Sequence, residues 1–344
     1  MIKTIDITEL FGLLDSLPLI DVRSPQEFRS GHIPGAFNLP LFNDEERALV
    51  GTRFVRTGRF SSVQLGLDLV GHKLSGTLNE ARKIAADGPF LIHCWRGGLR
   101  SASMAWLFDL AGMNVLVLSG GYKAYRNHIR QELGKPARLV VLAGKTGSGK
   151  TSILHALAQS GQQVLDLEKI AHHKGSVFGG LGMMPQPTNE QFENGLYSAW
   201  SQLDLGRPIW IEDESLSVGS VSIPEPLFSQ LLASPVLEIE VSFSRRVERL
   251  VREYSNFPGD DLISCILRIE KKLGGDNTRK AIDAVKEGDF TRTAEILLTY
   301  YDRAYDRSLQ MRAAQISRIS LPLPQDDPLE NAKFLLGHYQ PEKR

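Results

Sequence analysis

Cysteine is scarce in this sequence of 344 residues, which has only Cys94 and Cys265. Two cysteines cannot form the disulfide framework of a small secreted domain, so a reducing, cytoplasmic location is expected. No apolar run approaches the roughly 20 residues that a membrane-spanning helix requires. The first residues also lack the basic-then-apolar order of a signal peptide. We therefore expect a cytoplasmic protein with no membrane partner.

Net charge is absent as well, because 40 Lys and Arg balance 40 Asp and Glu. This excludes nucleic-acid binding driven by overall charge, but it leaves room for local basic patches. The segment 47–67 contains Arg47, Arg53, Arg56 and Arg59 and no acidic residue, and the segment 122–138 has five basic residues against Glu132. Each segment alone is most often a solvated helix face or a linker. Together they indicate a track for a polyanion.

Short apolar runs alternate with helical patterns in both halves of the chain, which predicts an α/β fold. Gly134 and Pro136 interrupt the pattern and mark a domain boundary. We predict a first domain over residues 8–133, a second over 138–320 whose later part is helical, and a Pro-rich tail over 321–344. Strands are expected near residues 19–22, 37–39, 90–94, 115–118, 138–143, 163–167, 208–212 and 237–243.

The most informative stretch surrounds Cys94, which follows the apolar run Phe90-Leu91-Ile92. The pattern Cys-x-x-Gly-x-x-Arg-Ser is the one by which cysteine phosphatases bind phosphate. Backbone N–H groups of such a loop and the positive end of the following helix favour a reactive thiolate. We predict that Cys94 is the catalytic nucleophile and that an anion-binding loop follows it, made of Trp95, Arg96, Gly97, Gly98, Leu99 and Arg100. The alternative is a buried, inert cysteine, which we predict for Cys265 in its helical pattern.

The flanks of this loop resemble a rhodanese domain. They are Asp21-Val-Arg-Ser-Pro-Gln-Glu-Phe28, Gly31-His-Ile-Pro-Gly-Ala36 and Leu118-Ser-Gly-Gly121. The related dual-specificity cell-cycle phosphatases share the fold and remain an alternative. Five residues separate Cys94 from Arg100, whereas common sulfur-carrying rhodaneses have four. The wider nest of N–H donors suits a tetrahedral, phosphate-like anion, to which Arg96 and Arg100 can add bidentate contacts.

A complete P-loop pattern, G-x-x-x-x-G-K-[ST], occupies residues 144–151 between a predicted strand and a predicted helix. Its glycines let N–H groups surround a phosphate, Lys150 balances the charge, and Thr151 is a candidate Mg²⁺ ligand. The predicted phosphate-binding residues are Gly144, Lys145, Thr146, Gly147, Ser148, Gly149, Lys150 and Thr151.

Acidic partners of the P-loop are expected at the ends of the neighbouring strands. Asp166 and Glu168 follow one strand, and Glu212 and Asp213 end the apolar run Ile209-Trp-Ile, as in a Walker-B element. The alternative is a solvated strand end. The stretch 172–180 is polar and glycine-rich, and we interpret it as a loop that closes over the phosphate or a substrate base. Its paired histidines have no further Cys or His at ligand spacing, so zinc is not expected.

The two domains in this order, with Cys-Trp-Arg-Gly-Gly, Asp166-Leu-Glu168, Gly175-Ser176, Phe178-Gly179 and Glu212-Asp-Glu-Ser215, resemble the tRNA 2-selenouridine synthases. The resemblance implies an enzyme that replaces the sulfur of wobble 2-thiouridine in the tRNA anticodon by selenium from selenophosphate. It also implies S-geranylation of that sulfur with geranyl diphosphate. The hypothesis that follows assigns selenium to Cys94 and prenyl transfer to the P-loop.

Two other classes of function remain open. One is a rhodanese-type sulfurtransferase or thiol phosphatase fused to a nucleotide-dependent kinase, which would turn over ATP. The other is a non-catalytic binding module built on an inactive rhodanese fold. The intact Cys94 and the complete P-loop favour an enzyme.

Overall fold

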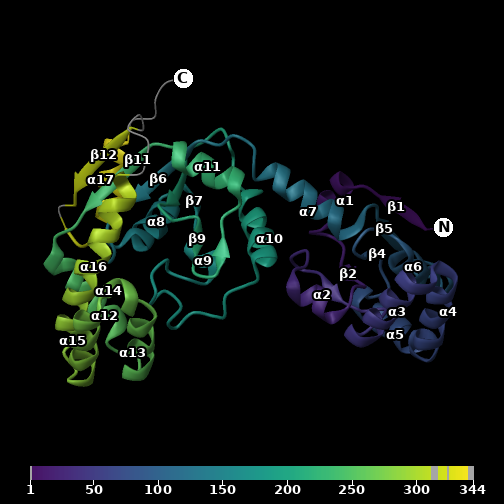
Figure 1. Cartoon of the computed structure of the whole chain (residues 1–344). Helices are drawn as coiled ribbons and strands as arrows, with labels where there is room; N and C mark the ends of the chain where they lie inside the picture. Colours follow the sequence, from purple (N-terminus) through teal and green to yellow (C-terminus); the bar gives the residue numbers. More distant parts are fainter. Residues whose placement is uncertain (1, 311–316, 324, 340–344) are drawn as a thin grey trace. The chain divides into compact units, whose positions relative to one another are not determined.

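The computed structural model describes residues 2–310, 317–323 and 325–339. The chain divides into two compact units, Met1–Glu132 and Leu133–Arg344 (Figure 1). Each unit contains a parallel five-stranded sheet with helices around it, and this confirms the predicted α/β class. Within the described residues, no helix is both long enough and apolar enough to cross a membrane.

The sheet of the first unit has the order β1-β5-β4-β2-β3. Its central strands are buried along their whole length, as expected for a parallel sheet covered on both faces. The strands are β1 (Lys3–Ile5), β2 (Leu19–Asp21), β3 (Phe37–Asn38), β4 (Phe90–His93) and β5 (Val115–Leu118). The surrounding helices are α1 (Ile7–Leu13), α2 (Pro25–Ser30), α5 (Leu74–Ala85), α6 (Leu99–Leu110) and α7 (Gly121–Glu132).

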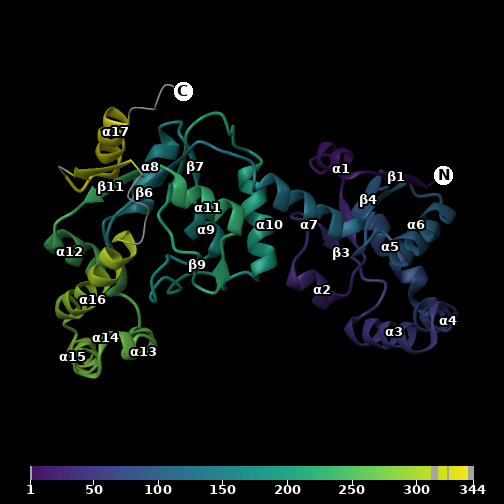
Figure 2. The same ribbon diagram turned by 45° about the horizontal axis from the view of Figure 1, so that its top comes forward.

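A helical hairpin is inserted between β3 and β4. It consists of α3 (Asp44–Thr57) and α4 (Arg59–Val70), which pack against each other and lie side by side in both views (Figures 1 and 2). A capping box between Asn43 and Glu46 starts α3. Gly58 joins the helices with φ +83°, a conformation that glycine adopts without steric cost. The short 3₁₀ turn Gly71–Lys73 then leads to α5.

The sheet of the second unit has the order β12-β11-β6-β8-β7, and all its strands are parallel. The strands are β6 (Leu139–Ala143), β7 (Gln163–Leu165), β8 (Ile209–Glu212), β11 (Val236–Glu240) and β12 (Arg318–Pro322). Around them lie α8 (Lys150–Gln159), α9 (Leu167–Ala171), α10 (Asn189–Trp200), α11 (Glu225–Ala233), α17 (Pro328–His338) and the small hairpin β9 (Ser217–Val218) and β10 (Val221–Ser222).

The remaining helices form a separate cluster with its own apolar core. They are α12 (Phe243–Tyr254), α13 (Gly259–Arg268), α14 (Glu270–Leu273), α15 (Gly275–Lys286) and α16 (Phe290–Gln310). Cys265 lies in α13 and is buried in this core, as predicted for a structural thiol, and burial raises the pKa of the thiol. These helices form the helical later part that we predict for the second domain, and α16, the last of them, ends at Gln310; residues 311–316 lie outside the described residues.

The predicted tail boundary at residue 321 falls inside β12. This strand pairs with β11 from Val236–Arg318 to Glu240–Pro322, so it completes the sheet. The following helix α17 packs on α8, and Ala332 and Leu335 are buried in the core beside Leu154 and Leu157. The segment 317–323 and α17 are therefore structural parts of the second unit.

Candidate functional sites

The first candidate site lies at the carboxyl ends of β2, β4 and β5. Cys94 directly follows β4, the central strand of that sheet. The strand β2 delivers Arg23, and β5 delivers the turn Ser119-Gly120-Gly121 to the same edge. Because carboxyl ends of parallel strands meet at one edge, this is where ligands of open α/β sheets bind.

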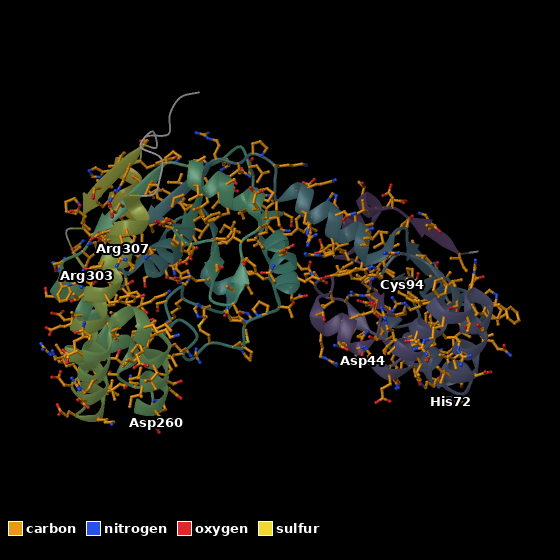
Figure 3. The ribbon with its side chains drawn as sticks, in the orientation of Figure 1. Asp44, His72, Cys94, Asp260, Arg303 and Arg307 are labelled. Atoms are coloured by element: carbon orange, nitrogen blue, oxygen red, sulfur yellow. The ribbon has the colours of Figure 1, made fainter. Side chains whose placement is uncertain are left out.

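Cys94, which is labelled in Figure 3, is only 3% exposed. Its Sγ lies 3.2 Å from the Oγ of Ser101, in the first turn of α6, and 4.0 Å from the carbonyl oxygen of Gly98. Ser101 is itself buried, and it is the serine of the Cys-x-x-Gly-x-x-Arg-Ser pattern. The thiol is therefore held in a fixed position at the start of a helix.

The loop after Cys94 has free backbone N–H groups. Within the described part of the chain, no acceptor binds the backbone N–H groups of residues 95–100. The carbonyl groups of the loop face the other way: Cys94 O accepts from Tyr122 N and Trp95 O accepts from Lys123 N, each at 2.9 Å. Such a row of N–H donors at a helix start is a nest suited to an anion.

Glycine is required where α7 begins beneath this loop. A Cβ atom on Gly121 would lie 2.3 Å from Cys94 O and 2.5 Å from Gly97 N. Gly121 also has φ +58° and Gly97 has φ +63°. The two glycines of the Ser-Gly-Gly sequence therefore allow the start of α7 to pack directly against the backbone of the thiol loop.

A buried ion pair supports the same loop. The Arg23 Nε and Nη2 atoms donate to both carboxylate oxygens of Asp21 at 2.6–3.0 Å, and both side chains are almost completely buried. The guanidinium carbon of Arg23 lies 3.9 Å from the ring centre of Tyr122 and 5.8 Å from that of Trp95. The Asp-Val-Arg sequence thus positions Trp95, the first residue of the anion loop.

Replacing Arg23 by methionine is expected to destabilise the first unit by about 3–5 kcal/mol, because the Asp21 carboxylate stays buried without its partner. Urea unfolding followed by circular dichroism measures this change. The control is Arg82→Ala, which removes an exposed pair with Asp87 and should cost at most about 1 kcal/mol. Equal effects of the two substitutions would show that the Asp21–Arg23 pair does not support the fold.

The two arginines of the predicted anion loop differ in their surroundings. Arg100 is half-buried and donates to Glu27 at 2.5 and 3.1 Å. Burial alone would raise the pKa of Glu27, but the Arg100 guanidinium holds it below its ordinary value. Arg96 and Leu99 are exposed. An anion in the loop therefore meets the N–H groups first, and it competes with Glu27 for Arg100.

The second candidate site is the P-loop, which connects β6 to α8. Lys150 donates from Nζ to Gly144 O at 2.8 Å. Two arginines of α12 hold the loop carbonyls, because Arg246 donates to Thr146 O at 3.2 Å and Arg249 donates to Gly147 O at 2.9 Å. The Lys145 side chain points elsewhere, to Asp306 at 3.1 Å. Among the predicted phosphate-binding residues, Lys145 does not line the cavity described next.

A cavity of about 820 Å³ opens beside the P-loop. One part of its wall is polar, formed by Gly144, residues 146–151 and Lys174. Another part is apolar and comes from the helical cluster, with Leu250, Val251, Leu262, Ala294 and Leu297. The cavity therefore combines a phosphate-binding loop with a wall that suits an apolar ligand group.

The predicted acidic residues separate into two kinds. Glu168 and Asp213 line the cavity, and Glu168 Oε2 accepts from Thr151 Oγ1 at 2.7 Å. Asp166 instead caps α9 through Lys169 N at 2.8 Å and lies 2.8 Å from His155 Nε2. Glu212 is completely buried and accepts from Leu167 N at 3.0 Å. Neither Asp166 nor Glu212 is among the residues that line the cavity.

Glu214 lines the cavity but was not among the predicted residues. Burial, followed by the nearby charge of Glu168, raises the pKa of Glu214 to about 8. Glu214 directly follows Glu212 and Asp213, the two acidic residues that the Walker-B pattern indicates. The strand ends at Glu212, and the chain then turns Asp213 and Glu214 toward the cavity.

The stretch 172–180 reaches the same cavity. Lys174, Gly175, Ser176 and Phe178 contribute to the wall, and Lys174 pairs with Glu253 of α12. The stretch therefore lies beside the P-loop, and its closing over a ligand stays a prediction. Across the described residues, no group of three or more His, Cys, Asp or Glu side chains is arranged to hold a metal ion by itself.

Comparisons with known proteins match both units. Residues 137–320 match the family model of the tRNA 2-selenouridine synthase AAA domain, and residues 6–128 match that of the rhodanese-like domain. A tRNA 2-selenouridine synthase of Sulfurovum sp. (strain NBC37-1) is 36% identical over 344 residues, which cover 88% of this chain and 92% of the relative. The proteins of the same name from Nitrosomonas europaea and Marinobacter nauticus are 33% and 35% identical, covering 89% and 91% of this chain and 92% and 93% of the relatives.

Proposed function

The chain belongs to the tRNA 2-selenouridine synthase family, and on this premise we propose that it modifies wobble 2-thiouridine in two steps. Geranyl diphosphate first alkylates the sulfur in the P-loop unit. Selenium from selenophosphate then replaces the geranylated sulfur with the help of Cys94. The assignment of prenyl transfer to the P-loop unit rests on the cavity of about 820 Å³, whose wall combines a P-loop with apolar side chains.

The composition of that wall supports a prenyl diphosphate as ligand. Diphosphate oxygens match the N–H groups of the P-loop and the Lys150 ammonium group. The ten-carbon geranyl chain needs apolar surroundings, which Leu250, Leu262 and Leu297 provide. A nucleotide kinase site would use the same loop, so direct binding of geranyl diphosphate is the discriminating measurement.

In the first step the sulfur of 2-thiouridine attacks C1 of geranyl diphosphate. The S–C bond forms, the C–O bond breaks, and diphosphate leaves with the bonding electron pair while the base loses a proton to water. Negative charge grows on the leaving oxygen, and Lys150 together with the N–H groups of the loop stabilises it. The alkylated sulfur becomes a good leaving group, since it can depart as geranylthiol.

In the second step the Cys94 thiolate attacks the phosphorus of selenophosphate seated in the N–H nest. The S–P bond forms as the P–Se bond breaks, and selenium leaves with the electron pair as hydrogen selenide, which stays bound in the loop. This selenide attacks C2 of the geranylated base and displaces geranylthiol. Water then cleaves the S–P bond, which releases phosphate and restores Cys94.

The P-loop site contains residues that suit a Mg²⁺ ion bound next to the diphosphate. The Thr151 hydroxyl and the Glu168 carboxylate lie 2.7 Å apart in the cavity wall, and both are oxygen ligands of the kind that Mg²⁺ prefers. If bound there, Mg²⁺ would neutralise negative charge on the phosphate oxygens. We propose Thr151 and Glu168 as the residues that would hold it.

The proposed function is tested with purified protein and tRNA that carries 2-thiouridine. Mass spectrometry of the digested nucleosides should show S-geranyl-2-thiouridine after addition of geranyl diphosphate, and 2-selenouridine after further addition of selenophosphate. Steady ATP hydrolysis with an unchanged nucleoside pattern would instead support the kinase alternative.

The pKa of Glu214 gives the P-loop site a specific pH dependence. Below pH 8 its carboxyl group is neutral and tolerates a bound diphosphate, whereas above pH 8 it is ionised and repels one. Affinity for geranyl diphosphate, measured with a chelator present, should therefore fall as the pH rises through about 8, by up to about tenfold per pH unit. Glu214→Gln should flatten this dependence between pH 7 and pH 9. An identical slope in the variant would contradict the assignment.

A further inference from the structure

We propose that the tip of the α3–α4 hairpin, residues 52–60, is a docking site for a single-stranded RNA loop, and that it holds this loop on the unit that carries Cys94. The inference rests on the proposed function, because that function places the target base in the tRNA anticodon loop. It adds the surface that recognises the loop and the chemistry by which it does so.

Every residue from 52 to 60 is exposed. Val55 is 85% exposed, Phe60 84% and Phe54 53%, so three large apolar side chains are exposed within seven consecutive residues. The helix α3 has no buried residue at all along its described length. A surface of this kind is expected to be covered by a partner.

The charge of the hairpin tip identifies the kind of partner. Arg53, Arg56 and Arg59 lie between the apolar residues, and no acidic residue occurs from Arg47 to Leu67. Among the described residues, no carboxylate pairs with any of these three arginines. Exposed aromatic rings next to unpaired arginines fit RNA in which bases are unstacked: the rings stack on bases, and the guanidinium groups bind phosphates.

The base of the hairpin, in contrast, is tightly anchored. Asp44, in the first turn of α3, accepts from Gln26 N at 2.7 Å and pairs with Arg29 at 3.1 Å, so α3 is fixed to α2. Glu46 pairs with Lys73 beyond the end of α4. Figure 3 labels Asp44, His72 and Cys94 in this unit. The hairpin is thus anchored to the unit at its base and exposed at its tip.

The anchored base also connects the hairpin to the thiol loop. Arg47 Nε lies 3.7 Å from the same Glu27 oxygen to which Arg100 donates at 2.5 Å. Arg100 closes the loop that begins at Cys94. The base of the hairpin therefore lies next to the loop that carries the nucleophile, and the tip extends from this base within the same unit.

The other basic segment, residues 122–138, is less suited to this task. Tyr122, Tyr125 and Arg126 of α7 are buried, and Arg126, Arg130 and Lys135 already have interactions within the protein. The arginines of the hairpin tip are therefore the better candidates for RNA contacts.

The test measures binding of the full-length protein to a fluorescent RNA hairpin with the anticodon stem-loop sequence, and to a fully paired RNA of equal length. Phe54→Ala/Phe60→Ala should weaken binding of the stem-loop by about tenfold or more through lost stacking, with little effect on the duplex. Arg53→Gln/Arg56→Gln/Arg59→Gln should weaken both, and should reduce the slope of log K against log salt by about 2.

Two control variants separate stacking from folding. Phe54→Tyr/Phe60→Tyr should retain binding, since tyrosine also stacks. Trp106→Ala, which removes a 59% exposed aromatic side chain from α6, should leave binding unchanged. The inference is overturned if Phe54→Ala/Phe60→Ala binds the stem-loop like the wild type. This holds also if that variant has lost self-association or binding to anionic vesicles. If the wild-type protein neither binds nor modifies the tRNA, the proposed function fails instead.

Discussion

We expect Cys94→Ala to abolish selenation and to leave geranylation largely intact. Removing the nucleophile of a covalent mechanism lowers the rate by about 10⁴-fold or more. Cys94 belongs to the first unit, whereas every residue that lines the P-loop cavity belongs to the second. The tRNA should therefore accumulate S-geranyl-2-thiouridine, which nucleoside mass spectrometry detects directly.

The matched control is Cys265→Ala, which removes the other cysteine. Cys265 is buried in the helical core and its thiol faces apolar side chains, so the substitution should lower stability without affecting selenation. Loss of geranylation in a folded Cys94→Ala protein that still binds tRNA would contradict the division between the two units.

Lys150→Ala has the opposite expected effect. It removes the ammonium group that balances the diphosphate, so geranylation should fall by at least about 100-fold, the size of effect produced when one donor that stabilises developing charge is removed. Affinity for geranyl diphosphate should also fall, by roughly tenfold or more for a lost charge-assisted hydrogen bond. Isothermal titration calorimetry and initial rates of geranylation measure both quantities.

Lys145→Ala provides the control within the same loop. Its Nζ atom pairs with Asp306 and its side chain does not line the cavity, so geranylation should stay close to that of the wild type. Equal losses in the two lysine variants would indicate general damage to the loop. Unchanged geranylation in Lys150→Ala would contradict the P-loop assignment.

The sequence predicted β4, β5 and β6 because each is an apolar run followed by a glycine-containing loop. It did not reveal β1 or β12, for which the local pattern is too weak. The strand β1 has three residues, of which only Ile5 is buried, and β12 has the burial pattern of an edge strand and ends in Pro322. Both strands exist because a neighbouring strand offers an open edge, which is a property of the tertiary fold.

The two site loops could be located from their motifs, but the side chains around them could not. Motif spacing placed Cys94 and Lys150, whereas the choice among Glu212, Asp213 and Glu214 depends on where β8 ends. In the same way, Arg100 was predicted to face an anion, and its pairing with Glu27 depends on the folded positions of α2 and α6. The exposed hairpin tip was visible only as a run of arginines, since the exposure of Phe54 and Phe60 is a property of the folded chain.

The central claim, that prenyl transfer and selenation use separate sites, is tested most directly by a relay between the two variants. Cys94→Ala protein is given thiolated tRNA and geranyl diphosphate, and the tRNA is then purified and given to Lys150→Ala protein with selenophosphate. Formation of 2-selenouridine in the second reaction is the predicted result, because that reaction requires Cys94 and no longer requires the P-loop. Failure of Lys150→Ala to selenate the geranylated tRNA, although it binds it, would contradict the account.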